Sequence, residues 1–138
     1  LFISLIILVF LKILNKFSEN LPILRNEIDN QNINFYINFI INALFESNKY
    51  FNDQEPWKKK DDKKRLDTIV YTSLEMIRKI SIMLYPIIPN SIIKSLTIFN
   101  LKIEEMNFES IGLNNYLKTG DKINKIDILF KKIEKKND

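Results

Sequence analysis

Glycine is almost absent from this chain, and its placement limits the possible folds more than any other feature. Only two glycines occur, Gly112 and Gly120, and both lie in the last quarter of the sequence. Antiparallel sheets favour glycine in their tight turns, so a sheet protein of this length would need more of them earlier in the chain. The sequence therefore predicts an all-α fold, a helical bundle, of the size of one ordinary domain.

Two long segments, Ile33–Asn52 and Leu66–Tyr85, carry apolar residues at helical spacing. The expected inward face of the first consists of Ile37, Ile40, Ile41, Leu44 and Phe51. The expected inward face of the second consists of Leu66, Ile69, Val70, Leu74, Ile77, Ile80 and Leu84. Pro86 and Pro89 should end the second helix, and Pro89 can begin a shorter one, because proline is tolerated in a first helical turn but not in a helix interior.

The periodic pattern fades after residue 100, which predicts two parts of the chain. Residues 1–100 should form the bundle, and residues 101–138 a loop and an extended C-terminal tail that packs back on it. Residues 1–14 are atypical because they are almost wholly apolar. They are too short to span a membrane, which needs about 20 apolar residues, and they lack the flanks of a signal peptide. A buried helix is the favoured interpretation.

Charge and composition restrict the chemistry. Cysteine and histidine are both absent, which excludes disulfides, thiolate nucleophiles, imidazole bases and Cys/His zinc sites. The carboxylates lack the spacing of a calcium loop, so no metal site is expected. The net charge of +4 equals that of residues 58–65 alone, where six basic residues face two acidic ones. Such a cluster suits a nucleic acid or an acidic membrane surface, or it is simply a solvated helix start.

The single tryptophan lies beside this cluster. Trp57 follows Pro56 and precedes Lys58, Lys59 and Lys60. Proline biases the residue before it toward an extended conformation, so Glu55 should end the first long helix. Aromatic rings stack on unpaired bases while lysines neutralise phosphates, which is the chemistry of single-stranded RNA recognition. The alternative is that Trp57 fills the gap between the two long helices.

A family resemblance is carried by residues 48–57, which read NKYFNDQEPW. This run is similar to the motif of the C-terminal, anticodon-binding helical domain of methionyl-tRNA synthetases, which are class I enzymes. Further positions match in the same order, namely Leu66, Tyr71, Glu75, Arg78, Pro86, Pro89, Phe108, Gly112, Gly120 and the run LFKKIE at residues 129–134. A proline that the family usually has after the Phe of that run is replaced by Lys131. The resemblance covers roughly residues 15 to 134.

The resemblance implies that Trp57 stacks on a base of the methionine CAU anticodon. Asn48 and Tyr50 match positions that brace this corner, and the periodicity places Asn48 on the buried side, where its amide should fix the turn. Reading of a base by Asn48 is the alternative. Glu75 and Arg78, spaced i and i+3, should form a structural pair.

One departure from the family concerns the first helix. The family has an Asn and, four residues later, an Arg that read anticodon bases, and those places fall near Leu5 and Val9. Neither side chain can hydrogen-bond a base. Either this lineage has lost specific recognition, or residues 1–14 are not native sequence, for example through a frameshift.

The expected function is tRNA binding in the cytoplasm, as the C-terminal part of a methionine–tRNA ligase. The family's catalytic signatures, His-Ile-Gly-His and Lys-Met-Ser-Lys-Ser, are both missing. The resemblance thus implies that ATP and Mg²⁺ bind in a catalytic domain of the same polypeptide, that this chain holds no catalytic residue or cofactor, and that the partner is tRNA of the methionine type. Two alternatives are a basic module on a membrane surface anchored by residues 1–14, and the equivalent domain of the sister synthetases for Ile, Val, Leu or Cys.

Overall fold

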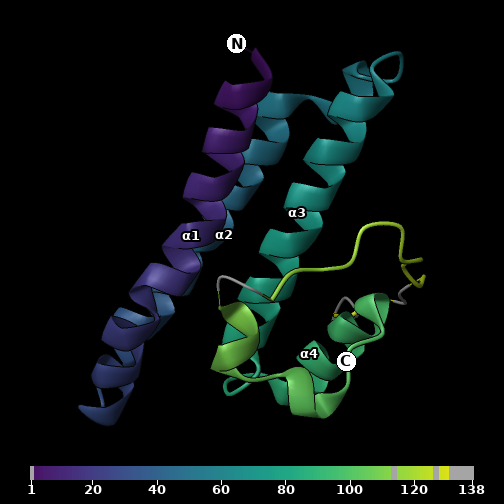
Figure 1. Ribbon diagram of the computed structural model, residues 1–138. Coiled ribbons are helices and arrows are strands. Elements are labelled where there is room, and N and C mark those ends of the chain that lie inside the picture. The colour runs from purple at the N-terminus through teal and green to yellow at the C-terminus, as the bar shows by residue number, and fades with distance from the viewer. Residues whose placement is uncertain (1, 113–114, 126–127, 131–138) are drawn as a thin grey trace, which may run out of the picture.

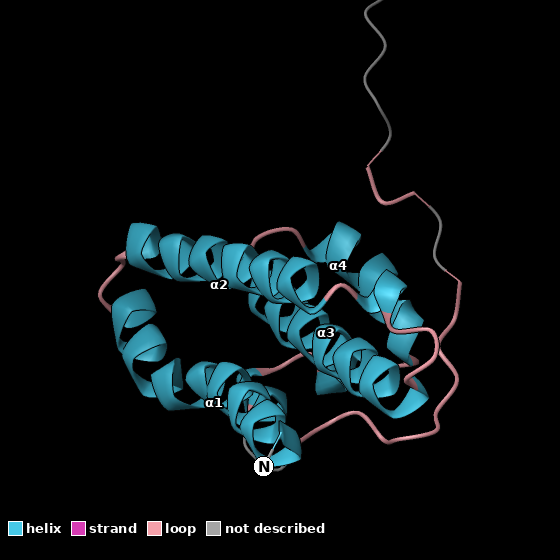
Figure 2. Cartoon of the chain, turned by 90° about the horizontal axis from the view of Figure 1, so that it is seen from above, coloured by secondary structure: helices cyan, strands magenta, loops and turns pink. Residues whose placement is uncertain are grey.

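The computed structural model describes residues 2–112, 115–125 and 128–130, and it describes the side chains from residue 11 onward. Four helices form the body of the molecule (Figure 1), namely α1 (Phe2–Asp29), α2 (Ile33–Gln54), α3 (Lys63–Leu84) and α4 (Pro89–Leu96). The described residues contain no strand (Figure 2). The prediction of an all-α bundle with an extended C-terminal tail is confirmed.

The three long helices run alongside one another with short connections (Figure 1). Asn32 is the N-cap of α2, and its side chain accepts a hydrogen bond from the Phe35 amide. Asp62 is the N-cap of α3, and its side chain accepts one from the Arg65 amide. Both caps satisfy amides that a helix start leaves without a partner. The N-terminal end of α1 and the α2–α3 turn lie at the same end of the bundle.

The inward face of α2 differs from the prediction by one residue. The buried side chains are Tyr36, Ile40, Ala43 and Tyr50, whereas Ile41, Leu44 and Phe51 are exposed. The helix is apolar on two adjacent faces, so periodicity alone favoured the face with more isoleucine and leucine. Tyr36 shows why the other face is inside: its hydroxyl donates to the Met83 carbonyl of α3 at 2.6 Å, and burial raises its pKa to about 12.

Helix α3 lies at the centre of the molecule and contacts α1, α2, α4 and the 3₁₀ helix η4 (Phe108–Ile111). The predicted inward positions Ile69 and Ile80 are buried, but Val70 and Ile77 are exposed. Several polar residues of α3 are buried instead, namely Thr72, Glu75, Arg78, Lys79 and Ser81. Thr72 donates to the Thr68 carbonyl within α3, and the Ser81 hydroxyl shares a hydrogen bond with that of Ser95 on α4. The three charged residues find their partners in the C-terminal part of the chain.

Helix α3 ends at Leu84, before Pro86, and α4 begins with Pro89, as predicted. We call residues 108–112 and 115–125 the strap. Within it, η4 contacts α1 and α3, and the Asn124 amide donates to the Ile98 carbonyl beyond α4. The basic end of the tail, residues 131–138, lies outside the described residues.

Helix α1 continues through Pro22, although proline usually ends or kinks a helix. Proline has no amide hydrogen and cannot donate to the carbonyl four residues earlier. The helix is retained because Leu14, Phe17 and Leu24, on both sides of the proline, are buried in the core. Within the described residues, no helix is long and apolar enough to cross a membrane.

Candidate nucleic-acid interface

The turn between α2 and α3 is a single 3₁₀ turn, η1 (Pro56–Lys58). Glu55 precedes it with φ 46° and ψ 58°, a left-handed conformation, so the predicted extended conformation is wrong. Its amide donates to the Asn52 carbonyl and its own carbonyl accepts from the Lys58 amide. A left-handed residue often ends a helix in this way, and it reverses the chain without breaking the hydrogen bonds of the last turn.

Trp57 lies on the outside of this turn. Its side chain is 52% exposed, and its ring contacts Phe51, itself 40% exposed, at a centroid distance of 6.1 Å. Pro56, in contrast, is buried. An exposure of this size does not fit a residue that fills the gap between two helices, so that alternative is wrong. The Trp57 ring presents an apolar surface to solvent.

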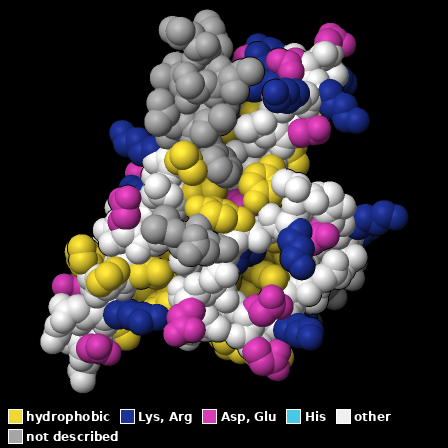
Figure 3. All heavy atoms as spheres, viewed as in Figure 1, with side chains coloured by type: hydrophobic (Ala, Val, Ile, Leu, Met, Phe, Trp, Pro, Cys, Tyr) yellow, Lys and Arg dark blue, Asp and Glu magenta, His cyan; other side chains and the backbone are white. Residues whose placement is uncertain are grey.

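Three lysines follow Trp57 directly in the chain. Lys58 forms an ion pair with Glu55 at 2.7 Å, Lys59 is half-buried and Lys60 is exposed. Figure 3 shows Lys and Arg side chains, mixed with Asp and Glu, at the end of the molecule where Figure 1 places this turn. The exposed ion pair contributes little to stability. An exposed aromatic ring and several cations therefore lie in one turn, at one end of the molecule.

A side-chain hydrogen bond that the sequence does not predict closes the turn. The Arg65 guanidinium, in the first turn of α3, donates to the Gln54 side-chain oxygen at the last residue of α2. This hydrogen bond joins the two helices on either side of Trp57. Arginine in a run of basic residues gives no sequence signal for such a role, because its partner is eleven residues away and outside the run.

Asn48 and Tyr50 occupy different sides of α2. Tyr50 is buried, with 7% of its side chain exposed, and it supports the corner from inside. Asn48 is exposed, so its predicted burial is wrong; the error follows from the one-residue shift of the inward face. Residues three apart share a helix face, which places Asn48 on the same side as Phe51, the residue that contacts Trp57.

The predicted pair of Glu75 and Arg78 is confirmed, with an ion-pair distance of 3.0 Å and both side chains buried. Arg78 also donates to the carbonyls of Ser110 and Asn115, and the Glu75 carboxylate accepts from the Leu117 amide. These hydrogen bonds join α3 to the strap. The pair is thus structural, and it lies on α3 far along the chain from the Trp57 turn.

Lys79 completes this buried cluster. Its ammonium donates to the Ile111 carbonyl at 2.5 Å and lies 5.0 Å from the centre of the Tyr116 ring. Burial, and then the neighbouring charge of Arg78, lower its pKa from 10.5 to about 8, although Glu75 acts in the opposite direction. Burial also raises the pKa of Tyr71 and of Tyr116.

The lowered pKa of Lys79 makes stability depend on pH. Between pH values of about 8 and 10.5 the unfolded chain keeps a proton that the folded chain has lost, so the free energy of unfolding should rise with pH. The slope should reach at most about 1.4 kcal/mol per pH unit. Below that window Lys79 adds nothing to the slope, because the folded and the unfolded chain both keep the proton. Urea denaturation of the wild type and of Lys79→Met across the window measures the difference. Equal slopes for the two proteins would contradict the assignment.

Leu5 and Val9, near which the resemblance would place the family's base-reading residues, lie in the first turns of α1. That end of α1 is at the same end of the bundle as the α2–α3 turn (Figure 1). Their side chains lie outside the described part of the chain.

Comparison with known proteins places this arrangement in a family. The sequence model for the anticodon-binding domain of methionyl-tRNA ligase matches residues 12–138. The chain belongs to this family. The match leaves out residues 1–11, and with them Leu5 and Val9.

Curated relatives agree with the family. The methionine–tRNA ligase of Rickettsia felis is 34% identical over 125 residues, which are 90% of this chain and 24% of that protein. The methionine–tRNA ligase of Brucella suis is 32% identical over 100 residues, covering 72% of this chain and 19% of that protein. That of Cytophaga hutchinsonii is 34% identical over 99 residues, covering 71% of this chain and 14% of that protein. The chain therefore spans about a quarter or less of the length of these relatives.

Proposed function

We propose that this chain binds the anticodon loop of tRNA as the anticodon-binding part of a methionine–tRNA ligase in the cytoplasm. The observation that carries the proposal is the half-exposed Trp57 at a lysine-rich turn, in a chain that belongs to the anticodon-binding family. Binding at the anticodon orients the distant acceptor end for aminoacyl transfer, so that part of the binding energy is used for positioning. ATP, Mg²⁺ and the reacting groups belong to a catalytic domain of the same polypeptide.

In this proposal Trp57 stacks on a base, and the exposed amide of Asn48 lies along the same face to hydrogen-bond a base edge. Tyr50 and Pro56 are buried and support the turn. Lys58, Lys59 and Lys60 neutralise phosphates. The loop that fits the family is CAU.

Replacing Trp57 with Ala should weaken binding to an anticodon stem-loop by roughly 1 to 3 kcal/mol, the value of a base–aromatic stack. The free energy of unfolding should change by about 1 kcal/mol or less, because the ring is half exposed. Anisotropy of a labelled stem-loop measures binding of both proteins, and Trp57→Phe should recover part of the loss.

Trp57 is the only tryptophan, so the fluorescence of the unmodified chain reports directly on this residue. Stacking should quench it when a CAU stem-loop is added. With Leu5 and Val9 at the family's reading positions, we expect poor discrimination between CAU and other loops. The double variant Leu5→Asn, Val9→Arg should improve that discrimination. The absence of quenching with every stem-loop, before and after this change, would refute anticodon binding.

Replacing Lys58, Lys59 and Lys60 together with Ala should weaken binding to CAU and altered loops to a similar degree, because phosphate contacts position RNA without specifying its sequence. The slope of log affinity against log salt should flatten by roughly 0.7 to 0.9 for each phosphate that is no longer neutralised. Lys94→Ala, at an exposed site on α4, is the control. A slope unchanged in the triple variant would place the lysines away from the RNA.

A further inference from the structure

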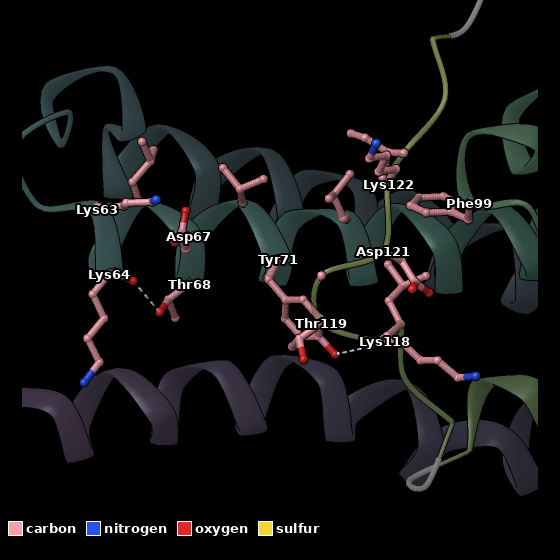
Figure 4. A pocket seen from close by; sticks show the side chains of 16 residues that line it. Lys63, Lys64, Asp67, Thr68, Tyr71, Phe99, Lys118, Thr119, Asp121 and Lys122 are labelled. Carbon is pink, nitrogen blue, oxygen red and sulfur yellow. Dashed lines mark hydrogen bonds between the residues drawn. The ribbon is translucent and has the colours of Figure 1, made fainter.

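A groove lies beside the lysine cluster, between the N-terminal half of α3 and the strap. It has a volume of about 1140 Å³ and begins at Lys63 and Lys64, in the first turn of α3. In Figure 4 these lysines lie at one end, and Lys118 and Lys122, from the strap, lie at the other. The side chains of Lys64 and Tyr71 point from α3 toward α1.

The charge, the apolar surface and the length of the groove restrict which ligand it can bind. Four lysines line it against two aspartates, Asp67 and Asp121, which leaves a net charge of +2. Its remaining surface is mostly apolar and includes Val70, which is 39% exposed, and Ile123, which is 54% exposed. Along α3 it extends from residue 63 to residue 74, about 16 Å at the rise of an α-helix.

The occupant must therefore be an elongated anion with apolar faces. A single nucleic-acid strand has both properties, since its phosphates repeat every few ångströms while its bases and riboses are partly apolar. Continuity with the Trp57 turn favours this occupant over an acidic protein segment. Lys63 follows Lys59 by only four positions, so an RNA strand bound at the turn is already next to the end of the groove that Lys63 and Lys64 line.

We propose that this groove binds the backbone of the RNA strand that continues from the loop held at Trp57. Lys63 and Lys64 neutralise the phosphates next to the loop, and Lys118 and Lys122 those farther along the strand. The strap thereby becomes one wall of the RNA site. This inference rests on the proposed function, because it assigns a second contact to the same RNA.

A negative charge placed in the groove tests the proposal. Val70→Glu should weaken binding of a CAU stem-loop by about tenfold, since it brings a carboxylate close to phosphate in a partly solvated site. Ile77→Glu is the matched control, because Ile77 is on the same helix, is 45% exposed and does not line the groove. It should bind like the wild type. Circular dichroism and urea denaturation establish that both variants are folded.

A second pair of variants removes cations instead. Lys118→Ala with Lys122→Ala should flatten the salt dependence by roughly 0.7 to 0.9 for each phosphate left without its lysine. Lys94→Ala with Lys102→Ala, both exposed and outside the groove, should not. With a loop-only oligonucleotide that lacks the continuing strand, the effect of Lys118 and Lys122 should disappear.

The outcomes separate this proposal from the proposed function. If Trp57 fluorescence is still quenched by the stem-loop while the Val70 and Lys118/Lys122 variants bind like their controls, the groove proposal is overturned and an acidic protein segment becomes the better occupant. If no stem-loop quenches Trp57, either in the unmodified chain or in the Leu5→Asn, Val9→Arg variant, the proposed function fails and the groove proposal fails with it.

Discussion

Replacing Arg78 with Met should lower the free energy of unfolding by about 3 to 5 kcal/mol, the cost of leaving one member of a buried ion pair without the other. Glu75 is fully buried, and its carboxylate would lose the guanidinium that neutralises it. The carbonyls of Ser110 and Asn115 would lose their donor as well. Urea denaturation followed by circular dichroism measures the change.

The double variant Glu75→Leu, Arg78→Met is the control for charge. It should be less destabilised than Arg78→Met, because no buried carboxylate is left without its guanidinium, while the Lys79 ammonium keeps its hydrogen bond to the Ile111 carbonyl. The changes in unfolding free energy caused by Glu75→Leu alone and by Arg78→Met alone would add up to that of the double variant if the two residues acted independently. That result would contradict a coupled pair. A decrease below about 1 kcal/mol for Arg78→Met would show that the cluster is solvated.

Replacing Ile69 with Ala should lower the free energy of unfolding by about 2 to 5 kcal/mol, because it removes buried methyl groups and leaves a cavity. Ile69 is fully buried on the face of α3 that packs in the core. Ile77→Ala is the matched control. That isoleucine is 45% exposed, so its replacement should cost about 0.5 kcal/mol or less.

The comparison of Ile69 with Ile77 also tests which face of α3 points inward. The periodicity predicts both to be inside, and the structure separates them. Equal decreases in stability for the two variants would mean that the exposed face of α3 is covered in solution.

The architecture was predictable because glycine and proline act locally. The lack of early glycine predicted helices, and Pro86 and Pro89 marked the end of one helix and the start of the next to within one residue. The inward face of α2 was not predictable in the same way. Its two adjacent apolar stripes have similar periodicity, and the buried one is distinguished by the hydrogen bond of Tyr36 with Met83 of α3, 47 residues away.

The candidate site, too, could be predicted from the sequence only in part. The turn at Trp57 could be predicted, because proline, tryptophan and lysines are neighbours in the sequence. The left-handed Glu55 and the Arg65–Gln54 hydrogen bond could not, since both depend on how the two helices meet. The groove includes strap residues some fifty positions beyond the first turn of α3, so only the folded chain shows it.

The buried charges of α3 hold the strap through its main chain. Arg78 and Lys79 donate to carbonyl groups, and Glu75 accepts from an amide, so none of these hydrogen bonds depends on which side chain the strap carries at that position. These hydrogen bonds therefore persist when the side chains of the strap change. Other strap positions remain constrained, because Ile111 is buried, Tyr116 contacts Lys79, and a side chain at Gly112 would meet the Glu109 carbonyl. Proline at position 117 would break one of these hydrogen bonds, because it would remove the amide hydrogen that Glu75 requires. Evolution can alter the exposed groove wall at residues 118–123, and with it the fit of the proposed RNA strand, while these hydrogen bonds hold the strap to α3.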